Sequence, residues 1–499
     1  MSSSIKSLVL AALLAAGLAH AALPEPVAQL MQSAQIPQEA AGVIVMRGDT
    51  VLVSHNPTLS MQPASTMKLF TTMAALEQLG PVFRGRTEFR TNADVVNGVL
   101  QGDLILRGGA DADLNEDALS HMLQALRNQG IRRIKGDIVV DRQLFQPSRP
   151  DAGQPPFDEY PWAYYNVIPN AALVNTNLLK VEMRSSADKL SLVMLPELDK
   201  VSIRSEMKLS DTPCAAWENG WRSPDYTRKG DRIEVVLHGS FPKDCVKSTS
   251  INVLDSQDYL ARLLLAEWRQ QGGTLSGEVR DSGTTIPASR LLAEHVSRTL
   301  PEILRDTNKQ SDNTLARTIF LSLGSLEADP TLGSRPLAAD AGRASTAMRA
   351  ETAIRAWLQQ HNIDGNGLVV DNGSGLSRSE RATPAQLAGV LQAGLKSLWM
   401  PEFLASLPIA ATDGTMRRRL KDSPAAQRAR LKTGSLKGVI AVAGYVPDAS
   451  NQPCIVVAIL NDEHVANGAG RAVLDALTDW VARQGGATAQ APLPPPDNR

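Results

Sequence analysis

The segments with the clearest β-strand pattern stand near opposite ends of a 499-residue chain. Near the start, residues 42–54 (GVIVMRGDTVLVS) contain two apolar runs separated by a turn. Near the end, residues 438–446 and 454–460 flank a second turn, and residues 470–484 have apolar side chains at helical spacing. Strands at both ends with helices between them predict an α+β domain whose sheet joins the two ends of the chain.

The length of the chain exceeds what one hydrophobic core usually holds, so two or three domains are expected. Short strands, turns and Pro-rich stretches dominate the middle of the chain. We therefore predict a main domain formed by residues 22–84 and 287–486, and an insertion of two nested small domains at 85–286. Residues 487–499 form a Pro-rich tail without the amphipathic pattern of a membrane-surface helix.

The insertion contains a weak internal repeat. Two apolar segments that begin at Leu119 and Leu260 each have helical spacing, and each is followed by Gln-Gly and a strand-like run. This pattern indicates either a reused helix–strand unit or a coincidence of common patterns.

The first residues have the pattern of a secretory signal. Lys6 supplies a positive charge, Leu8 to Leu18 is apolar, and Ala19-His20-Ala21 is a small-x-small cleavage site. The apolar run is about half as long as a membrane-spanning helix requires. We expect export to the periplasm, cleavage of residues 1–21 and no transmembrane anchor; an uncleaved anchor is the alternative.

Composition narrows the classes of function. The net charge of −1 and the pI near 6.7 do not suggest nucleic-acid binding, which usually requires a basic face. Cys214 and Cys245 could form a disulfide in an exported protein, whereas Cys454 lies in an apolar strand and is expected to be a buried free thiol. No His/Cys cluster has the spacing of metal ligands, and we expect no cofactor or metal.

Three short motifs carry the functional signal: Ser65-x-x-Lys68, Ser311-Asp312-Asn313 and Lys432-Thr433-Gly434-Ser435. The first is not specific by itself, because Ser-x-x-Lys occurs five times, at Ser3, Ser65, Ser186, Ser205 and Ser240. The motif at Ser65 is expected at a helix start, the motif at Ser311 between two helices, and the motif at Lys432 at a strand start. Together, in this order, the three motifs are the set found in class A β-lactamases and penicillin-binding proteins.

The first motif suits nucleophilic catalysis. A serine hydroxyl needs an adjacent base, and lysine can act as one only if its pKa falls from about 10.4 toward roughly 7–8. Ser65 and Lys68 lie three residues apart on one helix face and can touch. Backbone N–H groups at a helix start can also stabilise developing negative charge.

The other motifs suit substrate binding and proton transfer. We expect Ser311 to relay a proton to the leaving nitrogen, and Asn313 to hold a substrate amide and orient the lysine base. Lys432 and Thr433 are expected to bind a terminal carboxylate. Gly434 would let an extended substrate lie along the strand, and the N–H groups of Ser435 and Ser65 would form an oxyanion hole. Each residue also has an ordinary structural role open to it, as a helix cap, a solvated charge or an edge-strand residue, but the three ordered motifs favour catalysis.

One basic segment has no place in these motifs. Its positive charge either makes the local electrostatic potential favourable for an anionic substrate or belongs to a solvated face. The segment comprises Arg417, Arg418, Arg419, Lys421, Arg428 and Arg430.

On these motifs the chain resembles the class C low-molecular-mass penicillin-binding proteins, the D-alanyl-D-alanine carboxypeptidase/endopeptidases of the bacterial periplasm. The first two motifs lie 311 − 65 = 246 residues apart, a separation that matches this family and is much longer than in class A β-lactamases. Further similar segments are residues 102–114, 136–145, 371–378 and 412–420. The resemblance implies a penicillin-binding, β-lactamase-like domain at 22–84 and 287–486, with an antiparallel sheet flanked by helices and an inserted α/β region.

The resemblance also implies a function. Ser65 would form an acyl-enzyme with peptidoglycan stem peptides, cleaving D-Ala-D-Ala termini or D-Ala cross-links, and β-lactam antibiotics would inhibit it covalently. Asp141 and Arg378 would bind the free end of the diaminopimelate side chain, with Phe145 as a wall. Lys437 stands where some relatives carry glutamine, which leaves the preference of the outer pocket open. The alternatives are a β-lactamase and a non-catalytic cell-wall binding protein.

Overall fold

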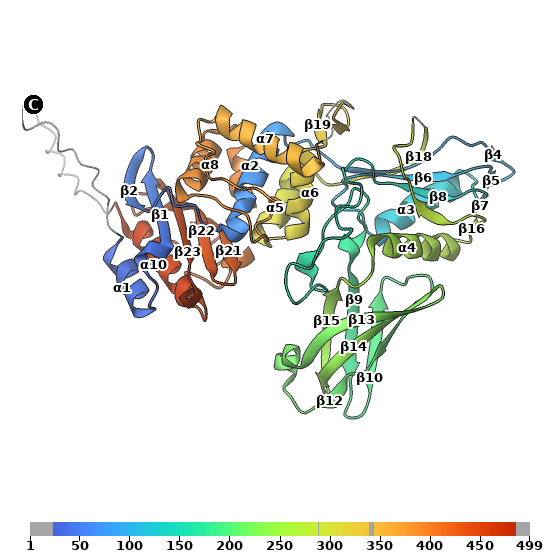
Figure 1. The fold of residues 1–499 in the computed structure, drawn as a ribbon, viewed down its shortest axis with the longest axis horizontal. Helices are drawn as coiled ribbons and strands as arrows, with labels where there is room; N and C mark the ends of the chain where they lie inside the picture. Colours follow the sequence, from blue (N-terminus) through green and yellow to red (C-terminus); the bar gives the residue numbers. More distant parts are fainter. Residues whose placement is uncertain (1–22, 288, 339–343, 486–499) are drawn as a thin grey trace, which may run out of the picture.

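The computed structural model describes residues 23–287, 289–338 and 344–485. The predicted signal peptide (1–21) and Pro-rich tail (487–499) therefore lie outside the described residues. Figure 1 shows a sheet-and-helix domain containing both ends of the described chain, and an insertion made of two β-rich parts beside it. None of the helices described is both long and apolar enough to span a bilayer.

A five-stranded antiparallel sheet forms the centre of the main domain and joins the two ends of the chain. Val43 of the first strand pairs with Ala458 of the last, and the strand order is β2-β1-β23-β22-β21. The strands are β1 (Ala41–Arg47), β2 (Thr50–His55), β21 (Arg430–Leu436), β22 (Val439–Pro447) and β23 (Pro453–Asn461). The predicted α+β fold, an antiparallel sheet flanked by helices, is confirmed.

Helices cover both faces of this sheet. On β23, Ile455 and Val457 belong to one hydrophobic cluster, while the alternate residues Val456 and Ala458 belong to another. Burial on both faces explains why the strand is apolar at successive positions. One face packs against α1 (Glu25–Ser33) and α10 (Ala469–Arg483). The other carries α2 (Lys68–Gln78), α5 (Leu300–Lys309), α6 (Asn313–Leu323), α7 (Thr346–Gln360), α8 (Pro384–Lys396) and α9 (Met400–Ser406). A small hairpin, β19 (Leu326–Asp329) and β20 (Gly333–Pro336), follows α6.

The first part of the insertion contains the two repeated sequence segments, which adopt the same order of elements. Each has a helix followed by two short strands: α3 (Glu116–Asn128), β7 (Arg133–Ile134) and β8 (Ile138–Asp141), then α4 (Ser256–Gln270), β16 (Thr274–Leu275) and β17 (Val279–Asp281). The matching strands pair in parallel, β7 with β16 and β8 with β17. The structure therefore favours a reused unit over coincidence. Its sheets are completed by β3 (Arg86–Thr91), β4 (Val95–Val96), β5 (Val99–Leu100), β6 (Leu104–Gly109) and β18 (Arg290–Val296).

The second part of the insertion consists of β-strands. They are β9 (Leu179–Ser185), β10 (Leu190–Leu195), β11 (Val201–Ser205), β12 (Lys208–Ser210), β13 (Trp221–Lys229), β14 (Arg232–Pro242) and β15 (Val246–Ile251). Its hydrophobic core is continuous with that of the first part: Leu237 and Val181 share one cluster with Leu106 and Leu263. Cys214 and Cys245 form a disulfide, and Cys454 is a buried free cysteine as predicted.

The insertion is predicted to end at residue 286, but its sheet includes a strand that lies after this residue. Strand β18 pairs antiparallel with β3, with Val296 opposite Arg86, so the insertion sheet ends after Val296. A boundary at 286 would separate this edge strand from its neighbour. Residues 290–296 (RLLAEHV) have no clear polar/apolar alternation and stand next to a strong helix start at Leu300. The sequence alone therefore does not show which domain holds the partner of this strand.

We expect the disulfide to stabilise the second part of the insertion. It closes a loop of 31 residues, and a chain-entropy model gives about 3–4 kcal/mol for a loop of that length. Replacing Cys214 and Cys245 together by Ser should therefore speed amide hydrogen exchange in β13 and β15. Strands β22 and β23 of the main domain serve as the internal control. Equal protection of β13 and β15 in both proteins would contradict this role.

Candidate active site

Ser65 and Lys68 lie where a short 3-10 turn continues into helix α2. The turn spans Ala64–Met67, and Lys68 is the first residue of the helix. The Lys68 Nζ atom lies 3.1 Å from the Ser65 Oγ atom. Ser65 is partly exposed, whereas the Lys68 side chain has no exposed surface. The two groups are thus in contact, with the hydroxyl facing solvent and the amine enclosed.

Burial makes the Lys68 amine a weak base that can be neutral near neutral pH. Its pKa is lowered from 10.5 to about 7, chiefly because burial removes the ammonium form from water. The charges of Asp312 and Glu380 oppose this shift, and that of Arg317 adds to it. The amine donates hydrogen bonds to Asn313 Oδ1 at 2.7 Å and to the Ser374 carbonyl at 2.5 Å.

The second motif occupies the junction between α5 and α6. Ser311 has a φ of +60°, in the left-handed region that residues other than glycine rarely adopt. Backbone strain of this kind is concentrated at functional sites. Asp312 caps α6 by accepting a hydrogen bond from the N–H of Leu315 at 2.9 Å. Asn313 then begins the helix, and its Nδ2 donates to the Tyr165 carbonyl at 3.3 Å. The cap fixes the direction in which Asn313 leaves the junction.

Lys432 connects the third motif to the second. Its Nζ atom donates to Ser311 Oγ at 2.8 Å and to the Thr433 carbonyl at 2.8 Å. The side chain is fully buried, and the pKa of its amine is lowered well below the ordinary value, first by burial and then by the nearby charge of Lys68. Burial and the nearby ammonium group of Lys68 thus both favour the neutral form of Lys432.

Strand β21 lies against the backbone of Ser65. It is the edge strand of the five-stranded sheet. A Cβ atom on Gly434 would lie 3.0 Å from Ser65 N and 2.8 Å from the Pro63 carbonyl oxygen, so only glycine permits this approach. Gly375, with φ of +83°, approaches the same turn: a Cβ there would lie 2.0 Å from the Ala64 carbonyl oxygen. Ser435 is exposed on the same edge strand.

The structure adds three groups to the site that the motifs did not include. The Ser374 carbonyl accepts from Lys68, and the Glu380 carboxylate accepts backbone N–H groups of residues 371–373. Thr415 Oγ1 lies 2.7 Å from Thr433 Oγ1. Glu380 is fully buried, and burial raises the pKa of its carboxyl group. The signal for Ser374 was the glycine-rich segment 371–378, and Glu380 lies two residues after that segment. Thr415 lies in segment 412–420.

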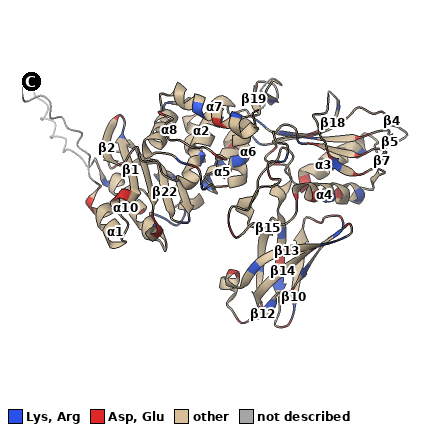
Figure 2. Ribbon diagram, viewed as in Figure 1, with Lys and Arg blue, Asp and Glu red and all other residues tan. Residues whose placement is uncertain are grey.

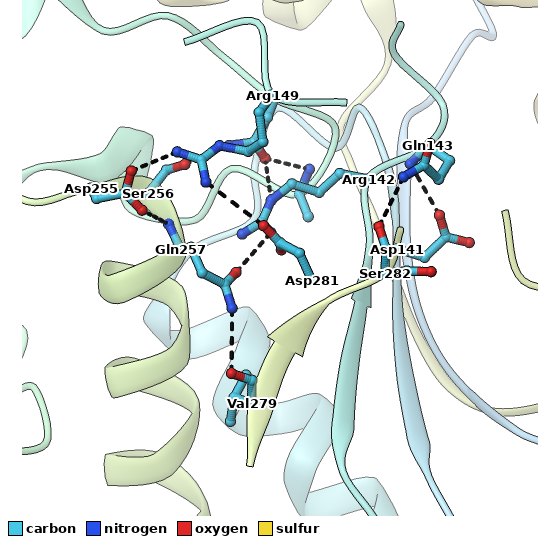
Figure 3. Close-up of polar contacts among 12 residues, drawn as sticks. Asp141, Arg142, Gln143, Arg149, Asp255, Ser256, Gln257, Val279, Asp281 and Ser282 are labelled. Atoms are coloured by element: carbon cyan, nitrogen blue, oxygen red, sulfur yellow. Dashed lines mark hydrogen bonds and ion pairs between the residues drawn. The ribbon is translucent and has the colours of Figure 1, made fainter. Parts of the chain in front are cut away.

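A cleft of about 720 Å³ adjoins the site. Its walls include α6, residues 371–379 and the Pro-rich segment 145–169 of the insertion. Arg378 and Phe145 both line it, and the Arg378 guanidinium lies 4.7 Å from the centre of the Phe157 ring. Two ion pairs anchor the Pro-rich segment: Arg149 within it pairs with Asp255 of the α4 N-cap, and Arg142, which precedes it, pairs with Asp281 of β17 (Figure 3).

Asp141 is placed differently from the expectation. It is the last residue of the buried strand β8, and its side chain is only 4% exposed. Its carboxylate accepts the N–H of Gln143 at 3.0 Å (Figure 3) and lies 3.4 Å from the Arg107 guanidinium. It is not among the residues that line the cleft. The structure thus brings Arg378 to the cleft but not Asp141, and a binding role for Asp141 stays a prediction.

Comparison with known proteins agrees with this geometry. The model of the D-Ala-D-Ala carboxypeptidase 3 (S13) family matches residues 23–484. The chain belongs to this family. The predicted resemblance to class C low-molecular-mass penicillin-binding proteins is thereby confirmed.

Individual known proteins are similar to this chain over most of their length. The D-alanyl-D-alanine carboxypeptidase DacB of Haemophilus influenzae is 27% identical over 82% of both chains. The D-alanyl-D-alanine carboxypeptidase of Actinomadura sp. is 28% identical over 93% of this chain and 85% of that protein. The crystal structure of penicillin-binding protein 4 from Haemophilus influenzae superposes with a TM-score of 0.73 at 24% identity, covering 92% of this chain and 99% of that one.

We expect the Lys68 amine to titrate near pH 7. Lysine-selective NMR of side-chain Cε and Nζ nuclei should show a titration with a pKa near 7 that disappears in Lys68→Arg, because burial of the Lys68 amine disfavours its charged form. The matched control variant is Lys309→Arg, at a second buried lysine, which pairs with Asp413 at 2.6 Å. The titration near pH 7 should persist in this control. A Lys68 pKa near 10 would contradict the enclosed site.

Proposed function

We propose that this S13-family protein is a serine-type D-alanyl-D-alanine carboxypeptidase that also cleaves D-Ala cross-links in peptidoglycan. The observation that carries the proposal is the buried Lys68 amine, with a pKa of about 7, at 3.1 Å from the Ser65 hydroxyl. The family match and the names of the relatives support the carboxypeptidase activity. The activity on cross-links, the serine mechanism and the periplasmic location are our own extensions.

In the first half of the reaction, Ser65 Oγ attacks the carbonyl carbon of the penultimate D-alanine while the neutral Lys68 amine accepts the hydroxyl proton. The backbone N–H groups of Ser65 and Ser435 stabilise the resulting oxyanion. Gly434 supports this arrangement because it lets β21 lie directly against the Ser65 backbone.

Collapse of the tetrahedral intermediate breaks the peptide bond and leaves the acyl group on Ser65. The leaving nitrogen takes a proton from the Ser311 hydroxyl, and Ser311 regains one from the Lys68 ammonium group, which becomes neutral again. Lys432 holds Ser311 by a hydrogen bond of 2.8 Å. Lys432 and Thr433 bind the carboxylate of the leaving residue, and Asn313 positions the Lys68 amine. Water then hydrolyses the ester, with Lys68 acting again as the base.

The proposal also covers where the protein acts and how it recognises the side chain of the stem peptide. The signal-like residues 1–21 support export to the periplasm, where the peptidoglycan stem peptides lie. Arg378, at the cleft wall beside Phe157, is a candidate for binding the free end of the stem-peptide side chain.

The nucleophile assignment is testable with penicillin, because a β-lactam presents an amide and a carboxylate in a similar arrangement. Mixing the protein with penicillin should give a long-lived mass increase mapped to Ser65, and Ser65→Ala should show none. The structure of the Haemophilus influenzae relative in complex with a β-lactam supports this choice of probe. A Ser65→Ala protein that still formed the adduct would overturn the assignment.

The same experiment separates the rival functions. An adduct that disappears within seconds while penicillin is consumed would indicate a β-lactamase. A protein that forms no adduct and leaves D-Ala-D-Ala peptides intact would indicate a non-catalytic cell-wall binding protein.

The pH dependence of acylation should follow the ionisation of Lys68. Only the neutral amine is a base, so the reactive fraction is lost as pH falls through a pKa of about 7. The second-order rate constant for penicillin acylation should rise about tenfold from pH 6 to pH 8 and then level off. Lys68→Arg should lower the rate by about 10³-fold or more at every pH. A wild-type rate independent of pH over this range would exclude Lys68 as the base.

A further inference from the structure

The basic segment predicted from the sequence divides into anchored and unanchored side chains. Arg419 pairs with Asp475 at 2.6 Å. Arg428 donates to the Asp448 carbonyl and to the Asn451 side chain, each at 3.0 Å. These two arginines hold the segment to its neighbours in the main domain and are accounted for by structural contacts.

Of the four other cations, Arg430 is half-buried on strand β21. Arg417, Arg418 and Lys421 are exposed, and within the described residues none of the three takes part in an ion pair. We call these three residues the basic rim. Lys and Arg are interspersed with Asp and Glu over the molecule as a whole (Figure 2), so the rim is a local concentration of unpaired positive charge rather than part of a basic face.

The basic rim lies next to the catalytic strand. It follows the 3-10 turn Gly414–Met416, whose Thr415 hydroxyl is 2.7 Å from that of Thr433. Two Cα–Cα steps of about 3.8 Å place the Arg417 Cα within about 8 Å of the Thr415 Cα. The side chain of Met416 is fully buried in a hydrophobic cluster of the main domain and so anchors the turn.

The turn is also held from the side of α5. Asp413 accepts from the buried Lys309 amine at 2.6 Å, and a Cβ atom on Gly414 would lie 2.5 Å from the Lys309 carbonyl oxygen. The rim therefore borders the Thr433 side of the site at a fixed position. None of its residues lines the cleft that contains Arg378.

Substrate chemistry on the Thr433 side differs between the two proposed reactions. If the carboxylate of the leaving residue lies at Thr433, a terminal D-alanine ends there and has no atoms beyond it. In a cross-link the leaving nitrogen belongs to a neighbouring stem peptide, which continues past this carboxylate and carries further carboxylates. Only a cross-linked substrate can reach beyond Thr415.

We propose that the basic rim, Arg417, Arg418 and Lys421, binds the carboxylates of the leaving stem peptide and so favours cross-linked peptidoglycan over D-Ala-D-Ala termini. This proposal rests on the proposed function. The contacts are exposed and hence individually weak, but three cations within about one Debye length of one another act on the same anionic peptide. Their combined effect on substrate binding should be about tenfold at low ionic strength.

The test compares two substrates and two charge variants. The rim variant is Arg417→Gln/Arg418→Gln/Lys421→Gln. The matched control is Lys189→Gln/Lys229→Gln/Arg232→Gln, which removes the same charge from exposed positions on the insertion. The substrates are a purified dimeric muropeptide cross-linked through D-Ala with unamidated carboxylates, and a monomeric pentapeptide that ends in D-Ala-D-Ala. Rates are measured at about 25 and 500 mM salt.

The rim variant should lose about tenfold in kcat/KM on the dimer at low salt, mainly through KM, and most of this loss should vanish at high salt because exposed charges are screened. Its kcat/KM on the monomer should change less than twofold. The kcat/KM of the control variant should change less than twofold on either substrate. A dimer whose leaving stem keeps the carboxylate next to the scissile nitrogen but is amidated at its further carboxylates should react with the wild-type protein as slowly as the unamidated dimer reacts with the rim variant. Amidation should then have no further effect on the rim variant.

Other outcomes would overturn the proposal. An equal loss on both substrates, or no loss on the dimer, would exclude a rim that binds the leaving stem and would leave the proposed function intact. A wild-type protein that cleaves only the monomer would exclude both the rim and the cross-link part of the proposed function, while its carboxypeptidase part would stand. Failure of the wild-type protein to form the penicillin adduct or to cleave the monomer would instead refute the proposed function itself.

Discussion

The site depends on one buried amine held beside one exposed hydroxyl. Moving an ammonium group out of water is unfavourable, so an enclosed lysine gives up its proton near neutral pH. Lys68 meets this condition with its amine in contact with Ser65, Asn313 and the Ser374 carbonyl. The neighbouring acidic charges, Asp312 and Glu380, keep the pKa from falling further. In the proposed mechanism, this balance lets the amine accept a proton from Ser65 and then return it.

The sheet explains how residues from three distant segments share this amine. Pairing of β1 with β23 brings the start of the chain to its end, and the edge strand β21 then lies against the turn that carries Ser65. The α5–α6 junction supplies Ser311 and Asn313 from the helical face. Small residues permit the close approach: Gly434 and Gly375 press on the same turn at distances that a side chain would block. Precision in this site comes from backbone packing as much as from the polar groups themselves.

The insertion contributes a wall to the site, and the basic rim contributes charge on another side. The Pro-rich segment 145–169 forms part of the cleft and is anchored to the insertion through Arg142 and Arg149. The rim is instead carried by the main domain, beside Thr433. A substrate with two peptide arms could therefore meet different chemistry on its two sides, one aromatic and one cationic.

Short-range patterns in the sequence determined the elements and the motifs. Alternating and helical spacing indicated the strands of both chain ends and the helices after Ser65 and before Ser311, because such spacing directly reflects which face is buried. The glycine-rich segment 371–378 was visible as a pattern, but its contacts with Lys68 were not. The pairing of strand β18 and the contacts of the Asp141 carboxylate were likewise not visible in the sequence. The partner of an edge strand and the direction of a strand-end side chain depend on what packs against them.

The sequence by itself thus determined the α+β fold class, the order of the three motifs and the residue types that the chemistry requires. Only the tertiary structure decided that Lys68 and Lys432 are fully enclosed, that Glu380 and Ser374 belong to the site, and that Arg378 reaches the cleft whereas Asp141 does not. The physical reason is that burial, and the pKa shifts that follow from it, are properties of everything that surrounds a group, and most of those surroundings come from parts of the chain hundreds of residues away.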